Sequence, residues 1–199
     1  MGLGVDQPWH WRISGTPAHA AASGVHSEST HMNILVRDSQ PEDMPIVHAI
    51  YSHYVLRGTA SFEEVPPDLN ETCRRRDAVL QARLPYLVAE RGGAVIGYSY
   101  ATLYRARSAY RHTAEDTVYV ASESSGHGVG RMLLGEVLRR SGQVGYREMV
   151  AIIGDSANTR SIQLHGALGF RMVGTLTNVG FKLGRWLDTV IMQCTLNEG

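Results

Sequence analysis

The chain has 199 residues, 43% of them hydrophobic, and its formal net charge is +0 at pH 7. This size and composition predict one domain with a full hydrophobic core. A balanced charge argues against electrostatic capture of nucleic acid or of a membrane surface, and the sequence has no apolar run long enough to span a bilayer. The cysteines, Cys73 and Cys194, lack metal-ligand spacing, so we expect a cytoplasmic protein without a bound metal.

Residues 1–32 differ in composition from the rest of the chain. Gly, Ser, Ala and His dominate this segment, which has no apolar periodicity. We expect a disordered N-terminal extension, followed by a single folded domain over residues 33–199. Four irregularly spaced histidines do not predict a metal site there, namely His10, His19, His26 and His31.

Apolar spacing and turn residues predict the elements of the folded domain. In chain order we expect a strand, two helices, three strands, a helix, a strand, a helix and the final strands. This order is typical of an α/β or α+β sandwich. The predicted ranges are 34–37, 41–58, 68–83, 85–90, 94–102, 115–121, 129–143, 147–153, 159–168, 173–181 and 186–196.

Two polar features belong to the first two predicted helices. Ser39 precedes a proline and is a candidate cap for the first helix. The second helix carries Arg74, Arg75 and Arg76, a run that would also suit nucleic acid. Acidic residues beside the arginines indicate a solvated helix face instead.

A strand, a glycine-rich turn and an amphipathic helix follow one another over residues 118–138. Gly126, Gly128 and Gly130 leave backbone N–H groups uncovered where this helix begins, and such a helix N-terminus binds phosphate. The spacing fits neither the dinucleotide fingerprint nor the nucleotide P-loop. It therefore predicts a phosphate-bearing ligand of another kind, with a tight turn that binds no ligand as the alternative.

The x-Gly-x-Gly turn after Val-Tyr-Val resembles the acetyl-CoA pyrophosphate loop of the GNAT acetyltransferases, although Ser125 stands where that family usually has Arg or Gln. About thirty residues later, Asn158 and Ser161 resemble the start of the helix on the other side of the cofactor. The resemblance implies a central mixed β-sheet of about seven strands with helices on both faces, and acetyl-CoA as co-substrate. It places at the acetyl-CoA site Val118, Tyr119, Val120, Ser125, Gly126, His127, Gly128, Val129, Gly130, Arg131, Asn158 and Ser161.

Longer segments narrow this resemblance to the phosphinothricin / methionine sulfoximine N-acetyltransferase group of GNATs. The most specific are Arg-x-Arg-x-Ala-Tyr over residues 105–110 and Gly-Phe-Lys-x-Gly-x-Trp over residues 180–186. The likeness runs from about residue 33 to 196. It implies acetylation of the amine of a small amino-acid-like substrate, by direct transfer in a ternary complex, and it implies a homodimer.

Acetyl transfer requires a neutral amine, so a carboxylate base assists the reaction. Glu115 matches the base proposed for the family, and His165 stands where many members have a tyrosine that protonates the departing thiolate; acid, base and packing roles remain open for this imidazole. Arg105 and Arg107 would point the same way in an extended segment and would suit an anionic substrate. Candidate residues of the substrate pocket, or for the last two of a dimer interface, are Phe62, Tyr110, Lys182 and Trp186.

Two other functions remain open at this point. A GNAT of this kind could acetylate protein N-termini, but paired arginines do not suit a generic peptide amine. The domain could also be a non-catalytic acetyl-CoA-binding module, which need not retain Glu115, Asn158 and His165.

Overall fold

The computed structural model describes residues 33–197. The extension expected over residues 1–32, with its histidines, lies outside the described residues, and its disorder stays a prediction. The described elements follow the predicted order. They are β1 (Leu35–Asp38), α1 (Met44–Arg57), α2 (Leu69–Gln81), β2 (Tyr86–Arg91), β3 (Ala94–Leu103), β4 (Thr113–Val120), α3 (Val129–Gln143), β5 (Glu148–Gly154), α4 (Thr159–Gly166), β6 (Arg171–Lys182) and β7 (Arg185–Thr195), with 3-10 helices at Pro41–Asp43, Ser108–Tyr110 and Ser122–Ser124.

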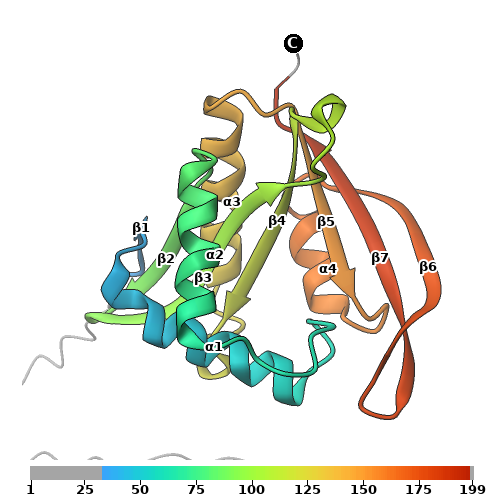
Figure 1. Cartoon of the computed structure of the whole chain (residues 1–199), viewed down its shortest axis with the longest axis horizontal. Coiled ribbons are helices and arrows are strands. Elements are labelled where there is room, and N and C mark those ends of the chain that lie inside the picture. Colours follow the sequence, from blue (N-terminus) through green and yellow to red (C-terminus); the bar gives the residue numbers. More distant parts are fainter. Residues whose placement is uncertain (1–32, 198–199) are drawn as a thin grey trace, which may run out of the picture. The chain divides into compact units, whose positions relative to one another are not determined.

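One mixed sheet carries the fold, in the strand order β1-β2-β3-β4-β5-β7-β6. The helices α1 and α2 lie on one face of this sheet, and α3 and α4 lie on the other (Figure 1). The core is densest beneath α3, where Leu133, Leu134 and Val137 are 0% exposed. Gly97 on β3 allows α3 to come this close, because a Cβ at Gly97 would lie 3.2 Å from Leu133 Cδ1.

The strands β4 and β5 pair in parallel over only three residues. Their contact runs from Thr113 opposite Glu148 to Glu115 opposite Val150, and then it ends. β4 continues to Val120 in antiparallel pairing with β3 alone. The two strands therefore part beyond Glu115 (Figure 1), and a cavity lies between them at that point.

The expected roles of Ser39 and Arg76 need correction. Ser39 is buried and forms no cap; its hydroxyl and carbonyl oxygens accept hydrogen bonds from the Arg76 guanidinium, at 2.8 and 2.6 Å. Arg76 is only 8% exposed and ties α2 to the end of β1, so the solvated-face interpretation is wrong for this arginine. Arg74 and Arg75 do stay near solvent and pair with Glu71.

Among residues 33–197, the longest and most apolar helices still fall short of what is needed to cross a bilayer.

Candidate active site

A cavity of about 790 Å³ occupies the cleft between β4 and β5. Residues 115–120 of β4 form one wall, and residues 151–154 of β5 form another. The glycine-rich turn before α3 and the first turns of α4 complete the lining. The segments predicted to surround acetyl-CoA therefore meet around one cavity.

The edge of β4 that faces β5 is unpaired beyond Glu115. Val118 and Val120, which were expected to offer backbone groups to the cofactor, lie on this stretch and line the cavity. The carbonyl of Val120 already accepts a hydrogen bond of 2.6 Å from the Tyr54 hydroxyl. Tyr119 lies between the two valines and points to the opposite face, where its ring meets Tyr51 edge-on.

The glycine-rich turn has the backbone conformation that its glycines allow. Gly126 and Gly128 have φ angles of 83° and 79°, a left-handed region that residues with a side chain avoid. Neither residue, nor His127 between them, donates a backbone hydrogen bond to any described residue. The first N–H groups of α3 lack partners within the helix as well. The turn therefore offers several free donors at a helix N-terminus, which fits the diphosphate of a coenzyme A.

Of the other residues predicted to bind the cofactor here, some line the cavity, and others pack against the neighbouring elements. Ser125 and Arg131 line the cavity, whereas His127 is exposed outside it. Val129 is 1% exposed and packs its side chain into the core. Gly130 lets α4 approach α3, since a Cβ there would lie 3.2 Å from Leu164 Cδ2.

The helix α4 begins at the far side of the cavity. Asn158 caps it, and its Oδ1 accepts a hydrogen bond of 3.3 Å from the backbone N–H of Ser161. Both residues line the cavity, and their contact with acetyl-CoA stays a prediction. The cap engages the amide oxygen of Asn158, so its NH₂ group is the part available to a ligand.

Glu115 is half-buried at the point where β4 and β5 part, and it lines the cavity. Burial raises the pKa of this carboxyl above its ordinary value, and the neighbouring Asp116 charge acts in the same direction. Arg105 opposes both effects. A carboxylate with a raised pKa at the inner end of a cleft is suited to accept a proton near neutral pH.

Beside Glu115 lies a buried pair of the predicted His165 and the unpredicted Asp116, and both residues belong to the cavity lining. His165 and Asp116 are 3% and 8% exposed, and Nε2 of the imidazole lies 3.0 Å from Oδ2 of the carboxylate. The Nδ1 atom of His165 lies 2.7 Å from the carbonyl oxygen of Ser161. Both ring nitrogens are thus occupied by protein atoms. The acid or base role considered for His165 stays a prediction, and it would require one of these bonds to break.

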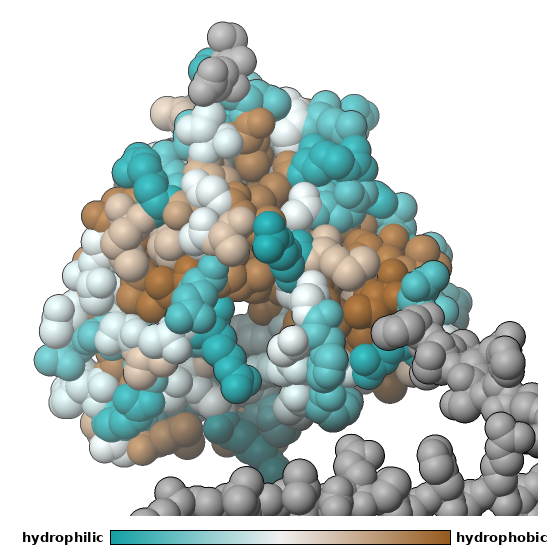
Figure 2. All heavy atoms as spheres, turned by 180° about the vertical axis from the view of Figure 1, so that it is seen from behind, coloured by the Kyte–Doolittle hydropathy of each residue, from teal (hydrophilic) through white to brown (hydrophobic). Residues whose placement is uncertain are grey.

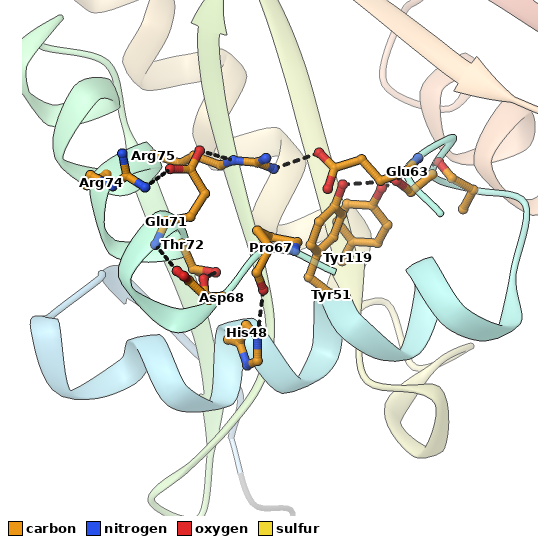
Figure 3. Close-up of polar contacts among 12 residues, drawn as sticks. His48, Tyr51, Glu63, Pro67, Asp68, Glu71, Thr72, Arg74, Arg75 and Tyr119 are labelled. Carbon is orange, nitrogen blue, oxygen red and sulfur yellow. Dashed lines mark hydrogen bonds and ion pairs between the residues drawn. The ribbon is translucent and has the colours of Figure 1, made fainter. Parts of the chain in front are cut away.

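The segment between α1 and α2 borders the cavity through Ala60. Figure 3 shows how this segment is held: Arg75 bridges Glu63, at 2.8 Å, and Glu71, at 3.0 Å. The Tyr51 hydroxyl lies 2.9 Å from the Ser61 hydroxyl, and the Tyr119 hydroxyl donates to the Ala60 carbonyl at 3.4 Å. α1, α2 and β4 together fix the segment beside the cleft.

Phe62 and Lys182, both predicted for the substrate pocket, meet at this segment. The Phe62 ring lies between two glycines: a Cβ would lie 2.9 Å from it at Gly154 and 2.3 Å from it at Gly180. The Lys182 ammonium donates a hydrogen bond of 2.6 Å to the Ser61 carbonyl. Lys182 is 3% exposed, and burial lowers its pKa against the opposing charges of Glu63 and Glu64.

None of the predicted substrate residues belongs to the cavity lining, Phe62 and Lys182 included. Arg105, Arg107 and Tyr110 are exposed on the segment between β3 and β4, where the Arg105 guanidinium lies 5.0 Å from the centre of the Tyr104 ring. Trp186 is 61% exposed and packs edge-on against Phe181. The structure brings Arg105 into electrostatic range of Glu115 but does not bring Trp186 to the cleft.

A second residue not predicted from the sequence is Asp155, at the end of β5. Its φ angle of 69° is uncommon for a residue with a side chain. The buried carboxylate accepts hydrogen bonds from the Thr59 hydroxyl and the Arg185 guanidinium. Asp155 thereby links β5 to the segment before Phe62 and to β7. These partners are remote in sequence, so no local pattern marks them.

The model of the Acetyltransferase (GNAT) family matches residues 47–170 of the chain. The chain belongs to the GNAT acetyltransferase family. It is 55% identical to a phosphinothricin N-acetyltransferase of Alcaligenes faecalis, over 82% of this chain and 83% of that one. It is 38% identical to an L-methionine sulfoximine/L-methionine sulfone acetyltransferase of Pseudomonas paraeruginosa, over 83% and 96% of the two chains.

Solved structures agree with this assignment. A GNAT phosphinothricin acetyltransferase of Sinorhizobium meliloti in complex with acetyl-CoA is 43% identical, with a TM-score of 0.82, over 84% of this chain and 91% of that chain. These matches confirm the predicted GNAT fold and the N-acetyltransferase class. In the part of the chain that the structure covers, no group of three or more His, Cys, Asp or Glu side chains forms a metal site.

Proposed function

We propose that this GNAT transfers the acetyl group of acetyl-CoA to the amine of a small amino-acid-like substrate of the phosphinothricin, methionine sulfoximine or methionine sulfone type. The observation that carries the proposal is the cleft between β4 and β5, with free backbone donors at its mouth and Glu115 at its inner end. The printed names of the similar enzymes support the substrate class.

The cleft holds acetyl-CoA mainly through backbone groups. The N–H groups of residues 126–131 bind the diphosphate, the unpaired edge of β4 binds the arm, and Asn158 adds an amide donor from α4. When bound, acetyl-CoA supplies an activated thioester. Ser125 does not replace the side-chain contact of the usual Arg or Gln, so the backbone bears the larger share of binding.

Glu115 removes the proton that keeps the substrate amine from reacting. An ordinary alkyl ammonium has a pKa of about 8–10, so most of it is protonated at neutral pH. Glu115 accepts that proton directly or through a water molecule, and its raised pKa brings it closer to the working pH. The neutral amine then attacks the thioester carbon, and the C–N bond forms as the C–S bond breaks. The thiolate takes up the proton that the acetylated nitrogen loses.

The acidic end of the substrate lies toward Arg105 and Arg107. Guanidinium groups bind a carboxylate or phosphinate through two hydrogen bonds, and Arg105 already lies within electrostatic range of Glu115. Phe62 packs against Gly154, which lines the cavity, and Lys182 binds the carbonyl of the preceding Ser61. A phosphinate or sulfoximine is tetrahedral and polar, and it would lie between these groups.

We also propose a homodimer, as the likeness to this group of GNATs implies. β6 is the last strand of the sheet, and its outer edge pairs with no other strand of residues 33–197. Figure 2, in which β6 and β7 lie on the left, shows separate hydrophobic patches among neutral and polar residues on that side. At least half exposed on these strands are Met172, Val173, Leu176, Val179, Phe181 and Trp186.

Initial rates of thiol release from acetyl-CoA with different amines test the proposed function. We expect kcat/KM for methionine sulfoximine or phosphinothricin to exceed that for a peptide with a free N-terminus by at least about a hundredfold, because two guanidinium contacts at ~1.5–3 kcal/mol each are lost with the peptide. A preference for the peptide would favour a protein N-terminal acetyltransferase. Binding of acetyl-CoA without release of thiol on any amine would favour the non-catalytic module.

A further inference from the structure

The hydrogen-bond partners of His165 indicate which of its ring nitrogens carry a hydrogen. The Ser161 carbonyl can only accept a hydrogen bond, so Nδ1 of His165 carries a hydrogen. The hydrogen bond from Nε2 to Asp116 needs a second proton, on either the ring or the carboxylate. The ordinary pKa of histidine, about 6.5, lies above that of aspartate, about 3.9, so this proton resides on the imidazole.

In these buried surroundings, the charge of each partner is compensated mainly by the charge of the other. Oδ1 of Asp116 is buried and has no hydrogen-bond partner among residues 33–197. The titratable groups near Asp116 are Glu115 and, on β7, Cys194, whose thiol stays neutral because burial and nearby acidic charges raise its pKa to about 12. Burial opposes the charged imidazole, but Asp116 outweighs this effect, and the pKa of His165 is raised.

The position of the pair connects it to the reaction. Asp116 follows Glu115 on β4, and successive strand residues point to opposite faces of the sheet. Glu115 is the last residue of β4 that pairs with β5, so Asp116 stands at the vertex of the cleft. His165 lies on α4, whose first turn carries Asn158 and Ser161 at the cavity. The pair therefore joins β4 to α4 beside the proposed base, and both of its residues belong to the cavity lining.

We propose that Asp116 and His165 are positioning residues: a buried imidazolium–carboxylate pair that holds α4 to β4 and balances the negative charge beside Glu115. This proposal rests on the proposed function where it concerns Glu115. Without the imidazolium, Asp116 would leave an uncompensated charge next to the base, and Glu115 would hold its proton to higher pH. His165 then acts through Asp116 and does not exchange protons with the substrates.

Nitrogen-15 NMR of the histidine rings tests the charge state without reference to catalysis. At about pH 7.5 we expect both nitrogens of His165 to be protonated, well above the pH at which an ordinary histidine has lost its charge. The His165→Gln variant assigns the signal by its loss. In Asp116→Asn the amide can donate to Nε2, so we expect a ring with one N–H. A singly protonated His165 in the unaltered protein would overturn the proposal.

The pH profile of kcat/KM tests the link to Glu115. We expect His165→Gln to move the acid limb of this profile to higher pH by about 0.5 unit or more. The double variant Asp116→Asn with His165→Gln should move the limb back toward its position in the unaltered protein. The matched control His53→Gln, on the exposed face of α1, should leave it unchanged. If the acid limb did not move in His165→Gln, or did not move back in the double variant, His165 would not balance the charge of Asp116 beside Glu115.

The NMR measurement and the pH profile test the proposal independently of each other. If Glu115→Gln kept full activity, the proposed base would be wrong, but the NMR measurement would still decide the state of the pair. If His165→Gln did not fold, Asp116→Asn alone would have to convert His165 to a ring with one N–H. A ring that stayed doubly protonated in that variant would refute the pairing.

Discussion

At the scale of single residues, the site depends on two adjacent carboxylates with different surroundings. Glu115 lines the cavity and has its charge partly offset only by Arg105, while Asp116 is buried against His165. The alternation of a β-strand separates them, because one side chain points to each face of the sheet. Both acids border the cavity, but only Asp116 is paired with a side chain of α4.

Glu115→Gln should lower kcat at least about tenfold at neutral pH, because a general base contributes typically ~10²–10⁴-fold. Acetyl-CoA affinity should change little, since the proposed binding site of the diphosphate is the backbone of the glycine-rich turn. In the unaltered enzyme kcat/KM should rise with pH through the raised pKa of Glu115, because only the ionised form accepts a proton. Steady-state rates across pH 6–9 measure both effects. Full activity of the variant over that range would remove Glu115 as the base.

Arg105→Ala and Arg107→Ala should each raise the KM for the amino-acid substrate about tenfold or more, because a charge-assisted hydrogen bond contributes ~1.5–3 kcal/mol. Their effect on the KM for acetyl-CoA should be small. Arg111→Ala on the same exposed segment is a matched control, since its guanidinium donates to the Ser108 carbonyl. Unchanged KM values in both variants would show that the anionic end of the substrate binds elsewhere.

At the scale of elements, the site is the place where β4 leaves β5 and where α3 and α4 begin. The periodicity of apolar residues was sufficient to predict all four helices and the seven strands, and the glycine spacing was sufficient to predict the turn before α3. Strand ends were less accurate: β4 begins at Thr113 and not at Glu115, because it pairs with Leu103 and its neighbours.

The contacts between distant elements could not be predicted from the sequence. Asp116 and His165 are 49 residues apart, Ser39 and Arg76 are 37 apart, and Thr59 and Asp155 are 96 apart. Each pair forms only because the sheet and helices bring both partners together. Local propensity carries no information on such pairs. The glycine-rich turn before α3 depends on residues that are adjacent in sequence, so it could be predicted.

Ser125→Ala and Gly128→Val should separate side-chain from backbone binding in the glycine-rich turn. Ser125 donates only a long hydrogen bond of 3.4 Å to Ala121, so its loss should change the acetyl-CoA Kd little. Gly128 has a φ of 79°, which a β-branched residue strongly disfavours, so the valine should distort the turn and weaken binding at least about tenfold. Calorimetric titration with acetyl-CoA measures both. A larger loss in Ser125→Ala would refute the backbone account.

At the scale of the whole molecule, the cleft divides the sheet into two parts that differ in exposure. β1 to β4 are covered by α1, α2 and α3, and they contain most of the core. β6 extends beyond the helices, and its apolar side chains are at least half exposed, whereas β7 contributes Val190 and Met192 to the core. An exposed apolar surface on a terminal strand pair is typical of a protein interface.

Leu176→Lys together with Val179→Lys should convert the proposed homodimer to a monomer, because charged groups would enter an apolar contact. Val144→Lys is the matched control, since Val144 is 53% exposed outside these strands. Sedimentation equilibrium gives the masses of all three proteins. A monomer before any substitution, or a dimer unaffected by the two lysines, would contradict an interface on β6.

The central claim is that the cleft between β4 and β5 delivers the acetyl group of acetyl-CoA to an amino-acid amine, and product stoichiometry tests it most directly. The protein is incubated with acetyl-CoA and methionine sulfoximine, and mass spectrometry and thiol titration count the products. The account predicts one N-acetylated amino acid for each thiol released, with both reduced at least about tenfold in Glu115→Gln. Thiol release without an acetylated amine, or no product from any amino-acid-like amine, would contradict it.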